Sequence, residues 1–113
     1  MHEMALCESI LAVLEEQSRK QSYSRVRAVC LEIGRLAGVE LSALSFGFEV
    51  VMRGSLAEGA ALEIVDVPGR AWCMKCAESV ELSSRADACP NCGGYQLQVT
   101  DGTQMRIREL EVD

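Results

Sequence analysis

The spacing of apolar residues predicts two helices in the first half of the chain. Between Glu3 and about Lys20, apolar residues recur every three or four positions, which is the period of one face of a helix. These residues are Leu6, Ile10, Val13 and Leu14. A second helical pattern runs from about Glu40 to Met52, and Gly54 follows it as a stop signal. Both segments are therefore expected to form helices with one apolar side.

Shorter segments alternate between apolar and polar residues, which is typical of strands. Residues 25–33 place Val29, Leu31 and Ile33 on one face, and residues 61–67 form a second pattern that ends at Pro68 and Gly69. Further strand candidates are residues 79–82, 95–99 and 104–112. Since residues 104–112 follow a turn at Asp101 and Gly102, we expect them to return to the first domain as an added strand.

The composition changes at Pro68 and Gly69, which marks a natural domain boundary. We expect one domain from residues 1–69, completed by residues 104–113. Residues 70–103 contain all the paired cysteines and should form a second, inserted module. A module this small buries little apolar surface, so it should need a staple such as a metal ion.

Four of the six cysteines form two C-x-x-C pairs. Cys73 and Cys76 are separated by two residues, twelve residues follow, and Cys89 and Cys92 repeat the spacing. Two such pairs can present four thiolates to one tetrahedral zinc ion at Zn–S distances of about 2.3 Å. Because four sulfurs leave no position for water, this zinc should be structural and not catalytic.

Composition and charge exclude several function classes. A chain of 113 residues with 49% hydrophobic and 25% charged residues is typical of a soluble globular protein. The net charge of -6 repels a phosphate backbone, so we expect no nucleic-acid partner. No apolar run approaches the roughly 20 residues that span a bilayer, and no secretory signal is present, so we expect a cytoplasmic protein without a membrane partner. Thiols stay reduced in the cytoplasm, which favours metal ligands over disulfides.

The only histidine, His2, lies next to the N-terminal amine. The amine of Met1 and the backbone nitrogen of His2 can close one chelate ring on a metal, and that nitrogen and the imidazole Nδ1 can close a second. Such a planar nitrogen set suits Ni(II) or Cu(II), and it should weaken at low pH because the amide must lose its proton. The backbone nitrogen or carboxylate of Glu3, or a ligand from a partner, could fill the fourth position. A lone histidine is, however, more often incidental.

Several short motifs occur together in this chain. They are the opening Met1, His2 and Glu3, the run Leu31, Glu32, Ile33 and Gly34, the segment Phe46 to Glu49, the stretch Glu58, Gly59 and Ala60, and the two C-x-x-C pairs. With this combination the chain resembles, over essentially its whole length, the HypA family of hydrogenase nickel-incorporation proteins. The resemblance implies an α+β fold: a small mixed sheet with two helices, plus an inserted four-cysteine zinc-ribbon-like module.

The resemblance also implies a function, that of a nickel metallochaperone and not an enzyme. Ni(II) would bind as transferred cargo at Met1, His2 and Glu3, and Zn(II) would stay at the four paired cysteines. The implied partners are HypB, a nickel-binding GTPase, and the large-subunit precursor of [NiFe] hydrogenase; some members also serve urease. We expect the GTPase to meet the first helix, and a homodimer stays open as a further arrangement. Some family members gain a nickel ligand from a histidine in the zinc module, and this chain has none there.

Two other functions compete with this one. The first is a non-enzymatic zinc-ribbon adaptor that binds proteins without transferring nickel; between residues 70 and 103, three basic residues stand against four acidic ones, which leaves no basic stripe for nucleic acid. The second is a thiol oxidoreductase, which would contain no zinc and would use cysteines of low pKa. Cys7 and Cys30 lie within predicted apolar elements, so we expect them to be core residues in every case.

Overall fold

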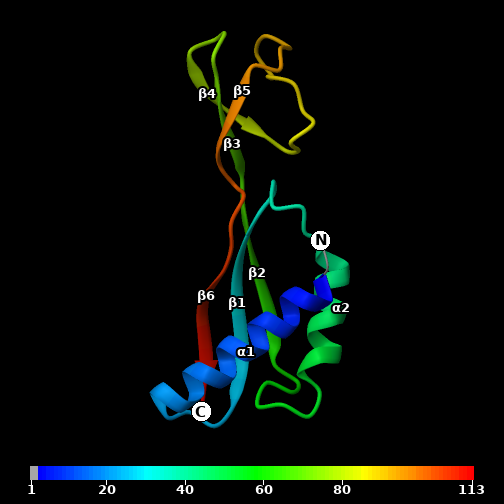
Figure 1. Ribbon diagram of the computed structural model, residues 1–113, viewed down its shortest axis with the longest axis vertical. Coiled ribbons are helices and arrows are strands. Elements are labelled where there is room, and N and C mark those ends of the chain that lie inside the picture. The colour runs from blue at the N-terminus through cyan, green and yellow to red at the C-terminus, as the bar shows by residue number, and fades with distance from the viewer. Residues whose placement is uncertain (1–2) are drawn as a thin grey trace. The chain divides into compact units, whose positions relative to one another are not determined.

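The computed structural model describes residues 3–113 and has an α+β fold, as expected (Figure 1). The helices are α1 (Glu3–Gln21) and α2 (Leu41–Met52). The strands are β1 (Val26–Gly34), β2 (Ala61–Val67), β3 (Gly69–Cys73), β4 (Glu78–Leu82), β5 (Leu97–Asp101) and β6 (Met105–Val112). Both predicted helices are present, and each predicted strand is found within about two residues of its expected bounds.

Strand β3 was not predicted from the sequence. The pair Pro68 and Gly69 indicated the end of a strand, whereas the chain passes Pro68 and begins β3 at once. Gly69 is needed at this place because a Cβ there would lie 2.5 Å from the carbonyl oxygen of Leu82. Strand β3 is held from both sides, with Ala71 opposite Val80 of β4 and opposite Val99 of β5. Its partners are therefore distant in sequence, and the local pattern does not reveal them.

The described residues form two compact units. The first comprises the described residues up to Leu31, together with Val39–Ile64 and Ile107–Asp113. The second comprises Glu32–Gly38 and Val65–Arg106.

The sheet with strand order β2-β1-β6 is mixed. Strand β6 runs antiparallel to β1, because Gln104 accepts from the Gly34 N–H and Asp113 donates its N–H to the Arg25 carbonyl at the opposite ends of the two strands. Strand β2 runs parallel to β1 instead. The Arg35 N–H donates to the Val67 carbonyl just beyond the end of β1, and the Val26 N–H donates to the Leu56 carbonyl near the start of both strands.

The core of the first unit is built from large aliphatic side chains. Those with less than 2% of their surface exposed are Leu14, Leu31, Leu44, Met52, Val26, Val29 and Cys7. Helices α1 and α2 approach closely at Gly47, where an added Cβ would lie 3.4 Å from Cys7 Sγ. Cys7 also donates its S–H to the Leu44 carbonyl at 3.5 Å. Cys7 and Cys30 are buried, which confirms that they are core residues.

The second unit contains the sheet β4-β3-β5 and a smaller core. Its buried cluster consists of Leu36, Ala71, Cys73, Val80, Leu82 and Cys89. The predicted turn after β5 is present: Gly102 has a φ of 88° and donates its N–H to Asp101 Oδ1 at 2.8 Å. Two of the six residues in this core, Cys73 and Cys89, thus belong to the C-x-x-C pairs.

Candidate metal centre

The four paired cysteines are carried by two turns of the second unit. Cys73 is the last residue of β3, and Cys76 follows in a turn that Ala77 completes with a φ of 55°. Cys89 and Cys92 lie in the loop between β4 and β5. Two backbone hydrogen bonds of 2.8 Å close that loop, from the Cys89 N–H to the Gly94 carbonyl and from the Gly93 N–H to the Cys89 carbonyl. The β-sheet therefore fixes one turn, and a hydrogen-bonded loop fixes the other.

The four sulfur atoms converge on one point. All four lie within 4.8 Å of one another. The Sγ atoms of Cys73 and Cys92 are 3.8 Å apart, and those of Cys76 and Cys89 are 4.0 Å apart. A tetrahedral ion with metal–sulfur distances of about 2.3 Å places its sulfurs about 3.8 Å apart. A disulfide needs about 2 Å, so this spacing fits four ligands of one ion and not two disulfides.

Backbone amides and neighbouring thiols set the protonation of the cluster. The Cys92 N–H, followed by the Asn91 N–H, points at the Cys89 sulfur and lowers the pKa of Cys89 to about 7. The pKa of Cys76 is raised to about 12, mainly through its hydrogen bond with the Cys92 thiol. Cys89 therefore loses its proton more readily than Cys76, because adjacent negative charges repel. A divalent cation offsets this repulsion and favours thiolates at all four positions.

The surroundings of the four sulfurs fit a structural metal ion and not a catalytic one. Cys73 and Cys89 are buried, and Cys76 and Cys92 are half-buried. The Asn91 side-chain amide donates to the Glu78 carboxylate, which ties the second turn to β4. Among residues 3–113, these four cysteines are the only group of three or more His, Cys, Asp or Glu side chains arranged to hold a metal ion. Four sulfurs complete a tetrahedral shell and leave no open position for a substrate.

Of the predicted nickel ligands, Met1 and His2 lie outside the described residues. Glu3 is the first residue of α1, and its carboxylate accepts the Glu40 N–H at 3.1 Å. This hydrogen bond is the main reason why the pKa of the Glu3 carboxyl lies below its usual value. The start of α1 is thereby attached to the residue just before α2.

The sequence predicted that the second helix begins at about Glu40, but it did not indicate that Glu40 caps this helix. It is the N-cap of α2, where its carboxylate accepts the Ser42 N–H at 2.9 Å and also bonds the Ser42 hydroxyl. These bonds, with the Ser42 hydroxyl first, lower the pKa of the Glu40 carboxyl. Glutamate is an uncommon N-cap, so only its place directly before the helical pattern could have indicated this role. Glu40 therefore has two roles: its backbone N–H donates to the Glu3 carboxylate, and its side chain caps the N-terminus of α2.

No helix within residues 3–113 combines the length and apolar character needed to cross a membrane.

Comparison with known proteins places the whole chain in one group. A family model described as "Hydrogenase/urease nickel incorporation, metallochaperone, hypA" matches residues 1–112. The hydrogenase maturation factor HypA of Alkalilimnicola ehrlichii is 61% identical over 113 residues, with both chains fully covered. The hydrogenase maturation factor HypA 2 of Bradyrhizobium diazoefficiens is 58% identical over the same length, again with full coverage of both chains.

A solved structure agrees with these sequence relatives. The solution structure of the Ni metallochaperone HypA from Helicobacter pylori matches with a TM-score of 0.70 at 27% identity. The match covers 99% of this chain and 97% of that one. The resemblance suggested by the N-terminal motif and the cysteine pairs is therefore confirmed, and the chain belongs to the HypA family of nickel-incorporation metallochaperones.

Proposed function

We propose that this protein binds one Ni(II) ion at its N-terminus and delivers it during the maturation of [NiFe] hydrogenase, while a zinc ion holds the cysteine module together. The observation that carries the proposal is the match of residues 1–112 to a nickel-incorporation family. The cluster of four sulfurs, with spacings of 3.8 and 4.0 Å, supports the second metal. The two metals have different roles: nickel is cargo and zinc is permanent.

Zinc is the metal proposed for Cys73, Cys76, Cys89 and Cys92. Four thiolates form a soft, tetrahedral donor set, and zinc has no geometric preference that opposes it. Nickel is proposed for the N-terminus because an amine, a deprotonated amide and an imidazole favour a planar ion. This assignment places nickel in the domain formed by residues 1–69 and completed by residues 104–113. It places zinc in the domain formed by residues 70–103.

The structure bears on the role of Glu3 in the nickel site. Its carboxylate already accepts the Glu40 N–H, so we assign the fourth nickel position to the backbone nitrogen of Glu3 and not to its side chain. The side chain would then act as an anchor that keeps the N-terminus beside α2. A site built from the chain end, with few ligands, can release its ion by ligand exchange more readily than a closed four-sulfur shell.

The proposed partners follow from family membership. A nickel-binding GTPase, HypB, would supply or regulate the metal, and the large-subunit precursor of [NiFe] hydrogenase would receive it; delivery to urease is included because the family description names it. The protein would act in the cytoplasm, as a carrier and not as an enzyme. The first helix, which begins beside the nickel ligands, is the proposed contact for the GTPase.

Nickel titration of the untagged, zinc-loaded protein tests this function. His2→Ala and a variant with three glycines added before Met1 should each weaken Ni(II) binding by more than about tenfold. The first removes the imidazole, and the second moves the amine too far along the chain from the imidazole for both to join adjacent chelate rings. A variant with three glycines added after Asp113 is the matched control and should bind as the parent does. Parent-like nickel affinity in both N-terminal variants would contradict the site and favour a zinc-ribbon adaptor.

Glu3→Gln separates the two roles of Glu3. Glutamine keeps the backbone nitrogen and can still accept the Glu40 N–H through its side-chain oxygen. Nickel affinity should therefore stay close to that of the parent. A loss as large as that of His2→Ala would show that the carboxylate itself binds nickel.

A further inference from the structure

A cleft of about 490 Å³ lies in the second unit, and none of the four paired cysteines lines it. Its lining comes from three segments that are distant in sequence: residues 35–38, which follow β1, residues 83–85, which follow β4, and Thr103, which lies between β5 and β6. This volume is within the roughly 300–1,000 Å³ typical of small-molecule sites. The cleft is therefore large enough to hold a small ligand.

Leu36 joins the three segments of the cleft. It is 3% exposed and packs in the buried cluster with Leu82, the residue just before 83–85. Its N–H donates to the carbonyl of Gly102, next to Thr103, at 2.8 Å, and its carbonyl accepts from Arg85 Nε at 3.1 Å. Because Leu36 belongs to the core of the unit, the cleft is formed before any ligand arrives.

The side chains that line the cleft are positively charged or neutral. Among the described residues of the lining, Arg35 and Arg85 are basic and none is acidic, in a chain with 17 acidic and 11 basic residues. Arg35 has an ion pair, since its Nε lies 2.8 Å from Asp66 Oδ2. Within residues 3–113, Arg85 forms no ion pair, and its guanidinium bonds only the neutral Leu36 carbonyl. The contacts of the fold therefore leave the positive charge of Arg85 without a counterion.

Hydrogen-bond donors of the cleft come from all three segments. Arg35 and Arg85 are each held through Nε, and within residues 3–113 their terminal nitrogens make no hydrogen bond. The same is true of the Ser83 and Thr103 hydroxyls within that range. A single arginine fork can match the two coplanar oxygens of a carboxylate. A phosphate group is tetrahedral, so it can accept from two arginines and a hydroxyl that approach from different directions.

We propose that this cleft binds the phosphate group of a small ligand between Arg35 and Arg85, with the Thr103 hydroxyl as a further donor. The net charge of -6 repels anions from the molecule in general, so binding depends on this local pair of guanidinium groups. Inorganic phosphate and a phosphate ester share the chemistry that the cleft recognises. The proposal does not depend on the assigned nickel function.

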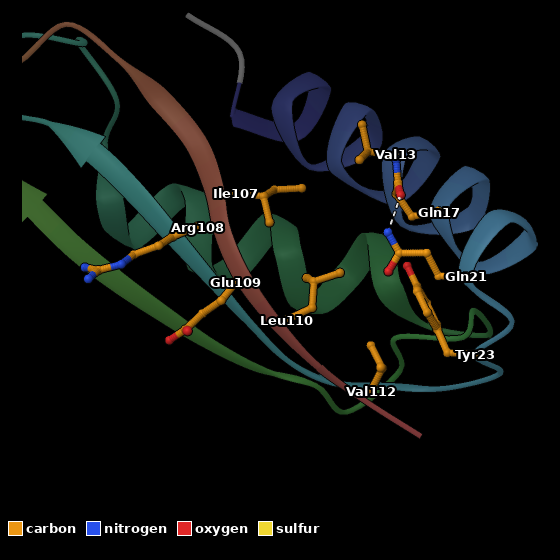
Figure 2. Close-up of a pocket in the computed structure, with 9 residues that line it drawn as sticks. All are labelled: Val13, Gln17, Gln21, Tyr23, Ile107, Arg108, Glu109, Leu110 and Val112. Atoms are coloured by element: carbon orange, nitrogen blue, oxygen red, sulfur yellow. Dashed lines mark hydrogen bonds between the residues drawn. The ribbon is translucent and has the colours of Figure 1, made fainter.

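A groove of the first unit has a similar volume but different chemistry. It measures about 460 Å³ and lies between α1 and β6 (Figure 2). Figure 2 shows Ile107 and Leu110 on one side of β6, and Arg108 and Glu109 on the other. Its one arginine therefore stands next to an acidic residue, and the charges of the two cancel. This groove offers no surplus of positive charge to an anion, and Arg108 provides a control for the loss of an arginine.

A phosphate titration of the full-length, zinc-loaded, nickel-free protein tests the cleft. The measurement is ¹⁵N nuclear magnetic resonance at constant ionic strength in a phosphate-free buffer, and the backbone amides of Gly38 and Thr103 should shift and saturate. Arg85→Gln should raise the phosphate dissociation constant at least about tenfold, because it removes a charged donor. Thr103→Val should raise it about threefold, because it removes a neutral one. Arg108→Gln changes the net charge as Arg85→Gln does and should bind phosphate as the parent does.

Two further ligands identify what the cleft accepts. Ribose 5-phosphate should bind more tightly than inorganic phosphate if the natural ligand is an ester, and more weakly if it is the free ion. Acetate should bind at least about tenfold more weakly than phosphate, since it cannot engage both arginines. Equally tight acetate binding would overturn the phosphate assignment.

The remaining outcomes decide whether the cleft is a binding site. The proposal is overturned if millimolar phosphate causes no saturable shift, if Arg85→Gln binds as the parent does, or if Arg108→Gln weakens binding as much as Arg85→Gln. Zinc content and the emission of Trp72 show whether Arg85→Gln keeps the fold of the second unit. If it does not, Thr103→Val decides, because the Thr103 side chain is exposed and makes no hydrogen bond within residues 3–113. Parent-like phosphate binding by Thr103→Val would then count against the proposal.

Discussion

The two units of this protein differ in what fills their cores. The first unit buries large aliphatic side chains, including Leu14, Leu44 and Met52, with less than 2% of their surface exposed. The buried cluster of the second unit is smaller, and two of its six residues are the paired cysteines Cys73 and Cys89. The first core is stable because apolar surface leaves water, whereas the second is completed by groups that can bind a metal.

This difference indicates which substitutions should destabilise each unit. Removal of an aliphatic side chain should destabilise the first unit, and removal of a sulfur should destabilise the second. The chain provides separate signals for the two. Helices α1 and α2 belong to the first unit, and the only tryptophan, Trp72, belongs to the second. Far-ultraviolet circular dichroism and tryptophan fluorescence therefore report on different units.

The largest expected effect comes from the metal ligands. Cys92→Ser should abolish tight zinc binding and leave the second unit disordered, since a structural zinc ion contributes roughly 10–16 kcal/mol in small domains. Zinc content per chain should fall, and Trp72 emission should shift to longer wavelength as its strand loses order. The helix signal of the first unit should remain.

Cys30→Ala is the matched control for this prediction. Cys30 is a buried cysteine of β1 outside the sulfur cluster, so its removal leaves all four proposed ligands in place. It should keep one zinc ion per chain and the Trp72 spectrum of the parent. If the Cys92→Ser protein kept one zinc ion per chain and an unchanged Trp72 spectrum, the stability of the second core would not depend on a metal bound by Cys92.

A smaller effect is expected from the aliphatic core. Leu44 is fully buried on α2, and Leu44→Ala should cost about 2–5 kcal/mol of unfolding free energy. The helix signal should melt at lower temperature or denaturant concentration, while zinc content stays at the parent value. Leu41→Ala, on the same helix but 42% exposed, should have little effect. Simultaneous loss of the helix and Trp72 signals would show that the two units unfold as one.

The contrast between the units also explains how much the sequence could predict. Helices and most strands follow from patterns within ten or twenty residues, and the C-x-x-C spacing places two sulfurs of each pair together by local geometry alone. Strand β3 was missed because its two neighbours come from later segments and its short run begins directly after Pro68.

The anchor at the N-terminus was missed for the same reason. The hydrogen bond from the Glu40 N–H to the Glu3 carboxylate joins residues 37 positions apart, and nothing in either local sequence indicates the other. Sequence patterns show which residues can form an element. They do not show which elements meet, because that depends on how the complete core packs.

The smallest expected effect concerns the Glu40 cap and is a pH dependence. The Ser42 hydroxyl and N–H stabilise the charged form of Glu40, which holds its pKa below the usual value of 4.5 in the folded protein. The unfolded chain therefore takes up the proton first as pH falls. The stabilisation is fully present above about pH 4.5 and is lost as pH drops through the folded pKa. Parent stability, measured by urea unfolding of the helix signal, should fall across this window.

Glu40→Gln tests this sign directly. The amide oxygen can still accept from Ser42 but does not titrate, so unfolding free energy should fall less steeply between about pH 5 and pH 3 than in the parent. Ser42→Ala removes the largest cause of the shift while leaving the backbone N–H, and its slope should lie between the two. The pKa of Glu3 is lowered as well, and Glu3 is retained in all three proteins; repulsion from the Glu40 charge is the smallest cause of its shift, so the difference in slope reports mainly on Glu40. Equal slopes in the parent and Glu40→Gln would mean that the cap holds α2 by hydrogen bonding alone, without a contribution from its charge.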